Sequence, residues 1–284
     1  MLVAVKAASV NPEDLFAVLT GRSAIAAGTT TAVGGAAEPL RPPFVAGSDC
    51  VAVVMKTGQG VKGLSEGDWV VPARAGLGAW RSLAVWRDKD LFKIPTELLP
   101  VEYAAMMRTM CTAYRLLEDH GSLKPGDSVL LNAANSAVGT VVIQLCVMLK
   151  LRPVAVIREG PRFAAAAAAL KALGAAEVLQ DGGSLREALA AKGPLFARPR
   201  LGLDAVGGRA SSRLAEALQE GSTLVVYGCM SGQSPLFDWD AWVFKDLIVR
   251  GFNLRRWVAT HKKKVRPCLV VAPPQPRGWC CRNV

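Results

Sequence analysis

The segment LLNAANSAVGTVVIQLCVMLKL, residues 130–151, predicts the fold class of this chain. An apolar strand leads into a group of small residues, and an amphipathic helix follows. This order is typical of the first unit of a dinucleotide-binding domain, whose turn usually reads G-x-G-x-x-G. The three glycine positions hold Ala134, Ser136 and Gly139 here. The turn is therefore a degenerate form of that motif.

The degenerate turn keeps the properties that phosphate binding requires. Gly139 keeps the last glycine, which lets the helix pack closely on the strand. Ala134 and Ser136 are small, so backbone N–H groups at the helix start can still face a phosphate. Asn135 and Ser136 add side-chain donors, and Ser136 is a good N-cap residue. A capped helix without a ligand explains the same residues, so this motif alone leaves both interpretations open.

The end of the following strand, AVIREG, bears on the choice of cofactor. A carboxylate at this point suits the ribose 2′-hydroxyl of NAD, whereas a basic residue suits the 2′-phosphate of NADP. Arg158 stands here and Glu159 follows it directly. The position of Arg158 favours NADPH over NADH. A solvated charge at a strand end is the alternative explanation of Arg158.

The chain divides into two parts with different patterns. Residues 1–100 contain short apolar runs separated by glycine, proline and aspartate, which indicates a β-rich domain. Strands and helices alternate over residues 101–257, which predicts βαβ units on a parallel sheet. Residues 23–43 are an aperiodic insertion, interpreted as disordered rather than as a lid, and residues 258–284 form a basic tail rich in proline and cysteine. Ligands of parallel sheets bind at the carboxyl ends of the strands, where the clusters NAANSAVG, REG and YGCM lie.

Composition argues against several classes of protein. The net charge is +11, but nine basic residues and no acidic one follow Asp246, so the rest is close to neutral and no nucleic-acid partner is expected. The longest apolar segment, around residues 163–176, is rich in alanine and contains Lys171, so no membrane span is expected. The seven cysteines show no C-x-x-C spacing, which favours a reducing compartment. His120 and His261 are isolated and expected at the surface.

These residues together resemble the zinc-free branch of the medium-chain dehydrogenase/reductase superfamily, and within it the mitochondrial enoyl-thioester reductases. The resemblance runs in family order from about residue 2 to 257. It is carried by AASVNPEDL, GLSEGDWVVPARAGLGAWRSLAV, MCTAYRLL, LKPGDSVLLNAANSAVGTVVIQL, LDAVGGRAS, LVVYGCM and FKDLIVRGFNLRRW. The resemblance implies an α/β fold in which a GroES-like β-barrel domain precedes a doubly wound Rossmann domain.

The resemblance also implies an activity. It implies that NADPH reduces trans-2-enoyl thioesters, carried on coenzyme A or acyl carrier protein, in mitochondrial fatty-acid synthesis. It implies a homodimer formed through an edge of the Rossmann sheet. Zinc-dependent relatives place cysteine and histidine ligands where this chain has NPED and GSDC, so no metal is expected.

The cofactor site follows from the resemblance position by position. Its groups are the phosphate side, the 2′-phosphate side, the nicotinamide side and a segment after the following helix. The phosphate side has Asn135, Ser136, Ala137, Val138 and Gly139, and the 2′-phosphate side has Arg158, Glu159 and Gly160. The nicotinamide side has Tyr227, Gly228, Cys229 and Met230, and the segment after the following helix has Phe252, Asn253 and Leu254. Thr109 stands where the family has an asparagine near the nicotinamide.

The chain departs from the family at the proton donor. Family members place a tyrosine shortly after NP-D, and this chain has Ser23 there. A serine hydroxyl is a far weaker acid than a phenol of pKa about 10, so no catalytic residue is assigned. Strands at the N-terminus and the C-terminal return to the first domain are expected to be missing. The tail after Trp257 is expected to derive from a wrong exon or frame, with a basic interaction tail as the alternative.

Three functions stay open at this point. The first is an NADPH-dependent enoyl-thioester reductase, and the second is an enzyme with quinone-reductase-like specificity, because quinone reductases share VNP-D and the glycine-poor turn. The third is a catalytically impaired or truncated nucleotide-binding relative, which Ser23 and the missing ends favour.

Overall fold

The computed structural model describes residues 1–21, 43–95, 100–196 and 198–261. Within these residues the chain forms two compact units. The first unit contains Met1–Arg108 together with residues 258–261, and the second contains Thr109–Trp257. Ser23, nearly all of the insertion at residues 23–43 and most of the tail lie outside the described residues.

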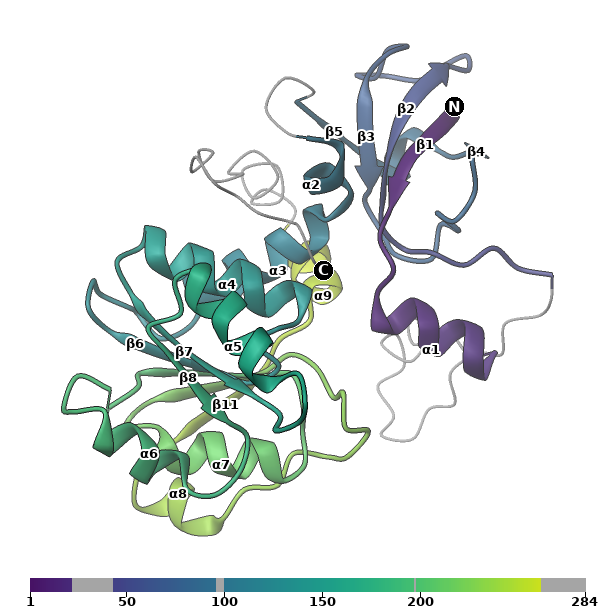
Figure 1. The fold of residues 1–284 in the computed structure, drawn as a ribbon. Helices are drawn as coiled ribbons and strands as arrows, with labels where there is room; N and C mark the ends of the chain where they lie inside the picture. The colour runs from purple at the N-terminus through teal and green to yellow at the C-terminus, as the bar shows by residue number, and fades with distance from the viewer. Residues whose placement is uncertain (22–42, 96–99, 197, 262–284) are drawn as a thin grey trace. The chain divides into compact units, whose positions relative to one another are not determined.

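The first unit is built on a five-stranded antiparallel sheet (Figure 1). Its strand order is β4-β1-β2-β3-β5. The strands are β1 (Leu2–Ala8), β2 (Cys50–Lys56), β3 (Trp69–Pro72), β4 (Leu83–Val85) and β5 (Leu91–Ile94). Successive side chains of a strand point to opposite faces. Val3, Val54 and Val70 therefore share the buried face, which confirms the β-rich pattern expected of residues 1–100.

Among the described residues, three short helical segments accompany this sheet: α1 (Pro12–Thr20), η2 (Asp88–Asp90) and α2 (Val101–Ala105). Helix α1 begins with proline, whose fixed φ suits the first helical position, and ends at Gly21 in the left-handed conformation (φ 62°). Trp86 belongs to the buried cluster of the unit. Its indole N–H donates to the Leu77 carbonyl at 3.1 Å, so the one polar atom of this large side chain is satisfied.

The second unit is built on a six-stranded sheet in which every pair of neighbours is parallel. Its strand order is β11-β10-β9-β6-β7-β8. The strands are β6 (Ser128–Leu131), β7 (Arg152–Ile157), β8 (Glu177–Gln180), β9 (Leu201–Asp204), β10 (Thr223–Val226) and β11 (Ile248–Gly251). The chain winds outward in both directions from β6 and β9, which is the doubly wound order with a switch point between these two strands. The predicted parallel sheet is thus confirmed.

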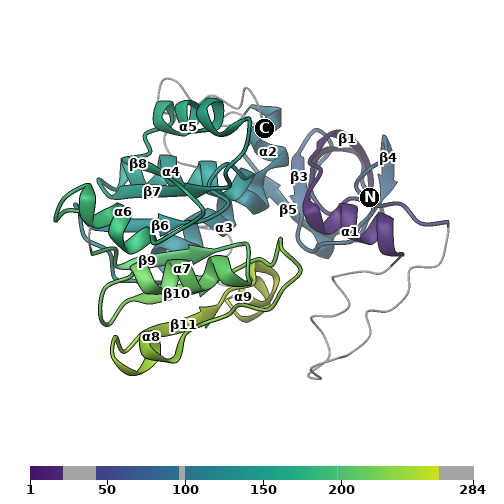
Figure 2. The same ribbon diagram turned by 60° about the horizontal axis from the view of Figure 1, so that its bottom comes forward.

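Helices cover both faces of this sheet. Figures 1 and 2 show α4 and α5 on one face and α6 and α7 on the other. The helices are α3 (Met107–Glu118), α4 (Ala137–Met148), α5 (Phe163–Ala172), α6 (Leu185–Ala191), α7 (Arg209–Ala217), α8 (Trp239–Val243) and α9 (Leu254–Thr260). The helical spacing of residues 100–119 gives two helices, because Met106 leaves helical geometry and closes α2 with a tight bond to the Tyr103 carbonyl at 3.0 Å.

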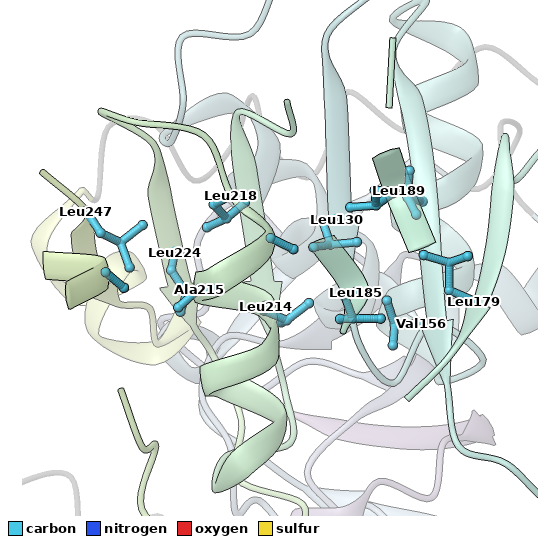
Figure 3. Packing of buried hydrophobic residues seen from close by; sticks show 13 residues of the cluster. Leu130, Val156, Leu179, Leu185, Leu189, Leu214, Ala215, Leu218, Leu224 and Leu247 are labelled. Atoms are coloured by element: carbon cyan, nitrogen blue, oxygen red, sulfur yellow. The ribbon is translucent and has the colours of Figure 1, made fainter. Parts of the chain in front are cut away.

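Leucine-rich packing holds the strand ends of the second unit in place. Figure 3 shows Leu130 and Val156 of the sheet among Leu185 and Leu189 of α6 and Leu214 of α7. All five are buried. Leu185, Leu189 and Leu214 are the apolar positions of their helices, so their burial against the sheet fixes where each helix lies on it. The carboxyl ends of β6 and β7 thereby become a rigid edge on which a site can be built.

Candidate functional site

The turn between β6 and α4 is tight although its first two glycine positions are filled. Ala133 adopts a left-handed φ of 46°, which is uncommon for a residue with a Cβ atom. The Ser136 N–H donates to the Ala133 carbonyl at 2.8 Å, and the Ser136 side chain accepts from the Gly139 N–H at 3.2 Å. Ala134 is fully buried. Ser136 is therefore the N-cap of α4, as expected from its type.

Gly139 presses the first turn of α4 against the turn before it. A Cβ atom at this position would lie 2.5 Å from the Ala134 carbonyl oxygen and 2.7 Å from both its carbonyl carbon and its Cα. These are backbone atoms, which cannot move aside as a flexible side chain can. The close packing expected of Gly139 is present, and it explains why this glycine remains where the other two are replaced.

The start of α4 presents unpaired backbone donors. The first N–H groups of a helix have no partner within the helix. Ser136 satisfies one of them, since its side chain accepts from the Gly139 N–H, while its carbonyl accepts the first regular bond of the helix from Thr140 at 2.9 Å. Among the described residues, no acceptor occupies the N–H groups of Ala137 and Val138. Together with the positive end of the helix dipole, these groups are suited to an anion.

Tyr227 directly follows β10, and its side chain lies close to the start of α4. Its N–H donates to the Asp204 carbonyl at 2.9 Å. Its hydroxyl is buried and close to the Ser136 hydroxyl, without the geometry of a hydrogen bond, and no other described residue pairs with it. Burial, and secondarily the Asp204 carboxylate, raises the pKa of the Tyr227 phenol above its ordinary value. The hydroxyl stays protonated and is a donor without an acceptor, which a native structure seldom leaves without a reason.

The three residues after Tyr227 belong to a loop that is anchored on the end of β9. Gly228 lies close to the Ala205 backbone, where a Cβ would meet the carbonyl oxygen at 3.0 Å. The Met230 N–H donates to that carbonyl at 2.9 Å. The Cys229 thiol is exposed and donates to the Gln233 carbonyl at 3.1 Å. The segment is thus held by its backbone and presents its side chains outward.

The residues expected at the 2′-phosphate lie at the end of the neighbouring strand. Strand β7 is paired with β6, with Ala155 opposite Leu131, so its carboxyl end lies beside the turn. Arg158, Glu159 and Gly160 follow it, and all three are exposed. The Gly160 carbonyl accepts from Phe163 at 2.9 Å, which starts α5. Arg158 is free to reach a ligand at this edge.

The remaining expected residues make fewer contacts with the turn before α4 and the strand ends beside it. The Phe252 N–H donates to the Val226 carbonyl at 2.9 Å, which ties the end of β11 to β10. The Asn253 side chain accepts from Arg256 at 3.1 Å and caps α9, which begins at Leu254. Thr109 is buried on α3, and its side chain makes no hydrogen bond to the other expected site residues among those the structure describes.

Sequence reasoning missed three buried polar residues at the switch point: Asn132, Asp204 and Ser211. Asn132 and Asp204 stand at the ends of β6 and β9, and the Asn132 side-chain amide donates to the Asp204 carboxylate at 2.6 Å. The available signal was a polar residue at the end of each of two apolar strands. Nothing in the sequence indicates that these residues meet across a separation of 72 positions.

In the first unit, the NPED and GSDC stretches form an ionic cluster. The Asn11 side chain donates to Asp49 at 2.8 Å, and Arg108 lies 3.0 Å from Asp49 and 3.4 Å from Glu13. Burial raises the pKa of Asp49 to about 6, opposed by Arg108 and reinforced by Glu13 and Asp14. Burial likewise raises the pKa of the Cys50 thiol to about 12. Among the described residues, no group of three or more His, Cys, Asp or Glu side chains could hold a metal ion.

The raised pKa of Asp49 makes stability depend on pH. The folded state holds this proton more tightly than the unfolded chain, so the stability from Asp49 is greatest below about pH 4 and falls as pH rises toward 6. We expect a fall on the order of 2 kcal/mol, because each pKa unit corresponds to about 1.4 kcal/mol. Urea unfolding at pH 4 to 7 should show this slope reduced in Asp49→Asn and unchanged in Glu66→Gln, which alters an exposed carboxylate of the same unit. An unchanged slope in Asp49→Asn would contradict the assignment.

His120 is half-buried rather than exposed as expected, whereas His261 is exposed. Its imidazole nitrogens are buried without a hydrogen-bond partner, and its ring packs edge-on against Phe252 with centroids 6.0 Å apart. Burial, with Arg250 and Arg115, lowers its pKa, so the neutral ring is favoured. Cys111 and Cys146 are buried on helices, as expected. No helix in the described ranges is long and apolar enough to cross a bilayer.

Comparison with known proteins identifies the family. Residues 1–96 match the alcohol dehydrogenase GroES-like domain. The chain is 36% identical over 263 residues to the mitochondrial enoyl-[acyl-carrier-protein] reductase of Dictyostelium discoideum, covering 92% of this chain and 71% of that protein. The chain belongs to the mitochondrial enoyl-thioester reductase family of medium-chain dehydrogenases/reductases. Its two-part α/β fold is thus a GroES-like domain with a Rossmann sheet.

Other members of the family are also similar to this chain. The human mitochondrial enoyl-[acyl-carrier-protein] reductase is 41% identical over 220 residues, which are 77% of this chain and 59% of the human protein. The chain therefore spans about three fifths of the length of this relative. The Etr1p/Etr2p heterodimer of Candida tropicalis, a mitochondrial 2-enoyl thioester reductase, superposes with a TM-score of 0.80 at 25% identity, covering 94% of this chain and 77% of that one.

Two further solved structures bear on cofactor and fold. The Etr1p/NADP/crotonyl-CoA complex matches with a TM-score of 0.79 at 25% identity, over 94% of this chain and 77% of that one. Escherichia coli quinone oxidoreductase complexed with NADPH matches with a TM-score of 0.71 at 22% identity, over 96% of this chain and 81% of that one. At that identity the quinone oxidoreductase shows the shared fold alone.

Proposed function

We propose that this chain binds NADPH at the start of α4 and reduces trans-2-enoyl thioesters. The observation that carries the proposal is the turn before α4, where Gly139 packs on Ala134 and the N–H groups of Ala137 and Val138 stay unpaired. The buried Tyr227 hydroxyl, a donor without an acceptor, lies beside the same turn. This donor set fits a pyrophosphate, because all of its groups donate.

Each group at the carboxyl edge of the sheet has a place in this proposal. The N–H groups of Ala137 and Val138 bind the pyrophosphate, with the Asn135 and Ser136 side chains beside them. Arg158 binds the 2′-phosphate through charge-assisted hydrogen bonds. Residues 227–230 line the nicotinamide side. The bound cofactor supplies the hydride.

The substrate class follows from the relatives. The human relative is named for acyl carrier protein, and the Etr1p complex holds crotonyl-CoA. We therefore propose enoyl thioesters of acyl carrier protein or coenzyme A. Reduction adds a hydride at Cβ and a proton at Cα, which yields the saturated acyl thioester and NADP⁺. Ser23 lies outside the described residues, and we assign the proton to no side chain among those described.

A second candidate function rests on Ser23. The resemblance places the proton-donating tyrosine of the family there, and a serine hydroxyl is a poor general acid. The chain would then bind NADPH and reduce enoyl thioesters slowly or not at all.

One experiment separates these functions. NADPH fluorescence is titrated against the purified chain with NADH as comparison, and crotonyl-CoA or 1,4-benzoquinone is then added while NADPH absorbance is followed. The proposed reductase requires tight NADPH-selective binding and turnover of crotonyl-CoA. Binding without turnover would favour the impaired relative, and turnover of the quinone alone would favour a quinone reductase. Absence of binding would refute the whole proposal.

The cellular setting and the domain division are also proposals. The relatives are named as mitochondrial enzymes, so we place this chain in mitochondria. We propose residues 1–100 as the GroES-like domain, residues 101–257 as the NADP-binding domain and residues 258–284 as an atypical tail. We propose no nucleic-acid or membrane partner.

We propose a homodimer formed through α8 and β11. Strand β11 is an edge of the parallel sheet and pairs only with β10 among the described strands, so its outer backbone groups are available to a second copy. Val243 is 67% exposed, and Trp239 and Phe244 are exposed beside it. So large an apolar surface on one edge is typical of a protein interface.

We expect Val243→Glu to convert the dimer to a monomer. Its charge would be buried unpaired in the apolar interface, which costs several kcal/mol per partner. Sedimentation velocity of the unsubstituted chain and of Val243→Glu at equal concentration measures this change. Val85→Glu, which alters an exposed valine of β4 in the other unit, should remain dimeric. A Val243→Glu protein that sediments as a dimer would place the interface elsewhere.

A further inference from the structure

A buried polar cluster lies at the switch point of the Rossmann sheet, apart from the residues assigned to the proposed NADPH site. Its members are Asn132 after β6, Asp204 at the end of β9 and Ser211 on α7. Asn132 is 1% exposed, and the other two are fully buried. Figure 2 shows β6, β9 and α7 next to one another in this unit. Buried polar groups at this point of the sheet require a reason, because apolar residues would pack there without desolvation cost.

The Asp204 carboxylate is fully hydrogen-bonded by neutral donors. Its Oδ1 atom accepts from the Asn132 side chain at 2.6 Å, from the Val206 N–H at 2.9 Å and from the Gly207 N–H at 3.1 Å. Its Oδ2 atom accepts from the Ser211 hydroxyl. Within the described part of the chain, no salt bridge joins Asp204 to a basic side chain. The carboxylate therefore serves to collect donors from three elements at one point.

On one side the cluster holds the turn before α4. The Asn132 side-chain oxygen accepts from the Ala205 N–H at 2.8 Å, and its backbone N–H donates to the Leu203 carbonyl at 3.1 Å. Both ends of the Asn132 amide are thus engaged, so the backbone directly before Ala133 has one position. Ala133 opens the turn that presents the N–H groups of α4.

On the other side the cluster holds the segment after β10. The Asp204 carbonyl accepts from the Tyr227 N–H, and the Ala205 carbonyl accepts from the Met230 N–H, each at 2.9 Å. The Val206 carbonyl accepts from the Ser231 N–H at 2.9 Å and from its hydroxyl at 2.6 Å. Residues 227–231 thus depend on the geometry of 204–206, which the Asp204 carboxylate fixes.

We propose that Asp204 is a positioning residue of the NADPH site. Through Asn132 it sets the phosphate-side turn, and through its own turn it sets residues 227–230 on the nicotinamide side. The inference rests on the proposed function, since it concerns the same site. It assigns one carboxylate the task of keeping two separate segments of the site in register.

The proposal predicts which substitutions matter. Asn132→Ala removes two hydrogen bonds and frees the turn. Asp204→Asn should be tolerated, because its oxygen can keep the three Oδ1 donors while its amide donates to the Ser211 hydroxyl, which can also accept. Ser211→Ala removes a single bond to the carboxylate. Ser212→Ala is the matched control, because its hydroxyl contacts Glu216 and Asp238 outside the cluster.

The test measures NADPH dissociation constants at a temperature where circular dichroism shows every variant fully folded. We expect an increase of about 10-fold in Asn132→Ala, as the loss of one or two buried hydrogen bonds implies, and about 3-fold in Ser211→Ala. Asp204→Asn and Ser212→Ala should stay within about 2-fold of the unsubstituted chain. Ser211→Ala carries the test if Asn132→Ala does not fold.

A purely structural role would lower the melting temperature of Asn132→Ala and Ser211→Ala and leave NADPH affinity unchanged, which would overturn the proposal. Equal weakening in Asp204→Asn would also overturn it, because charge rather than geometry would then control binding. If the unsubstituted chain binds no NADPH, the proposed function fails by itself. Amide hydrogen exchange without cofactor then decides: faster exchange in both 133–139 and 205–207 of Asn132→Ala supports positioning, and unchanged exchange in either segment refutes it.

Discussion

Gly139→Val should lower the free energy of unfolding by about 3 kcal/mol and abolish measurable NADPH binding. Its Cβ would lie within 2.7 Å of three backbone atoms of Ala134. Overpacking of this kind typically costs about 1–3 kcal/mol, and contact with backbone places this substitution at the upper end. Relief requires α4 to move away from the turn, which displaces the N–H groups of Ala137 and Val138 from the proposed phosphate position.

Gly139→Ala should lower the free energy of unfolding less than Gly139→Val does. Alanine is favoured over glycine in helices by about 1 kcal/mol, which offsets part of the clash, so we expect a net loss of about 2 kcal/mol. Urea unfolding and NADPH titration measure the two consequences. Gly182→Val is the matched control, because a Cβ there meets nothing within 4 Å in the same unit. A Gly139→Val protein as stable as the control would mean that helix and strand can separate freely.

Much of the second unit could be predicted because its signals are local. The apolar strand, the small turn residues and the N-cap Ser136 lie within ten positions of one another, and each follows from the physics of strand and helix ends. Alternating strands and helices then imply a parallel sheet. Because parallel strands run in one direction, their carboxyl ends all lie at the same edge of the sheet. This is why Arg158 and Tyr227 could be assigned to the same edge from residue order alone.

The unpredicted features depend on contacts between distant residues. The Asn132–Asp204 pair joins positions 72 residues apart, and the Asn11–Asp49 pair joins positions 38 residues apart. His120 is isolated in sequence, yet its ring packs edge-on against Phe252. Local patterns carry no information on such partners, because burial of a polar group depends on which segment the fold places against it.

Arg158→Ala should raise the NADPH dissociation constant about 10- to 100-fold and leave that of NADH within about 2-fold. Charge-assisted hydrogen bonds contribute about 1.5–3 kcal/mol, and each 1.4 kcal/mol is tenfold in affinity. Only NADPH carries the 2′-phosphate, so the loss is confined to it. Arg158→Glu should exceed this loss, since its carboxylate would repel the phosphate and suit the free hydroxyl of NADH.

The preference of NADPH over NADH should also weaken with salt, because Arg158 is exposed and its attraction to phosphate is screened. Arg152→Ala is the matched control, since it removes an arginine from the opposite end of the same strand, β7, and should change neither affinity. An equal loss of affinity for NADPH and NADH would mean that Arg158 contacts a part of the cofactor that both molecules have. No loss for either would make Arg158 a solvated charge at a strand end, and the cofactor preference of this chain would then have to come from another residue of the same edge.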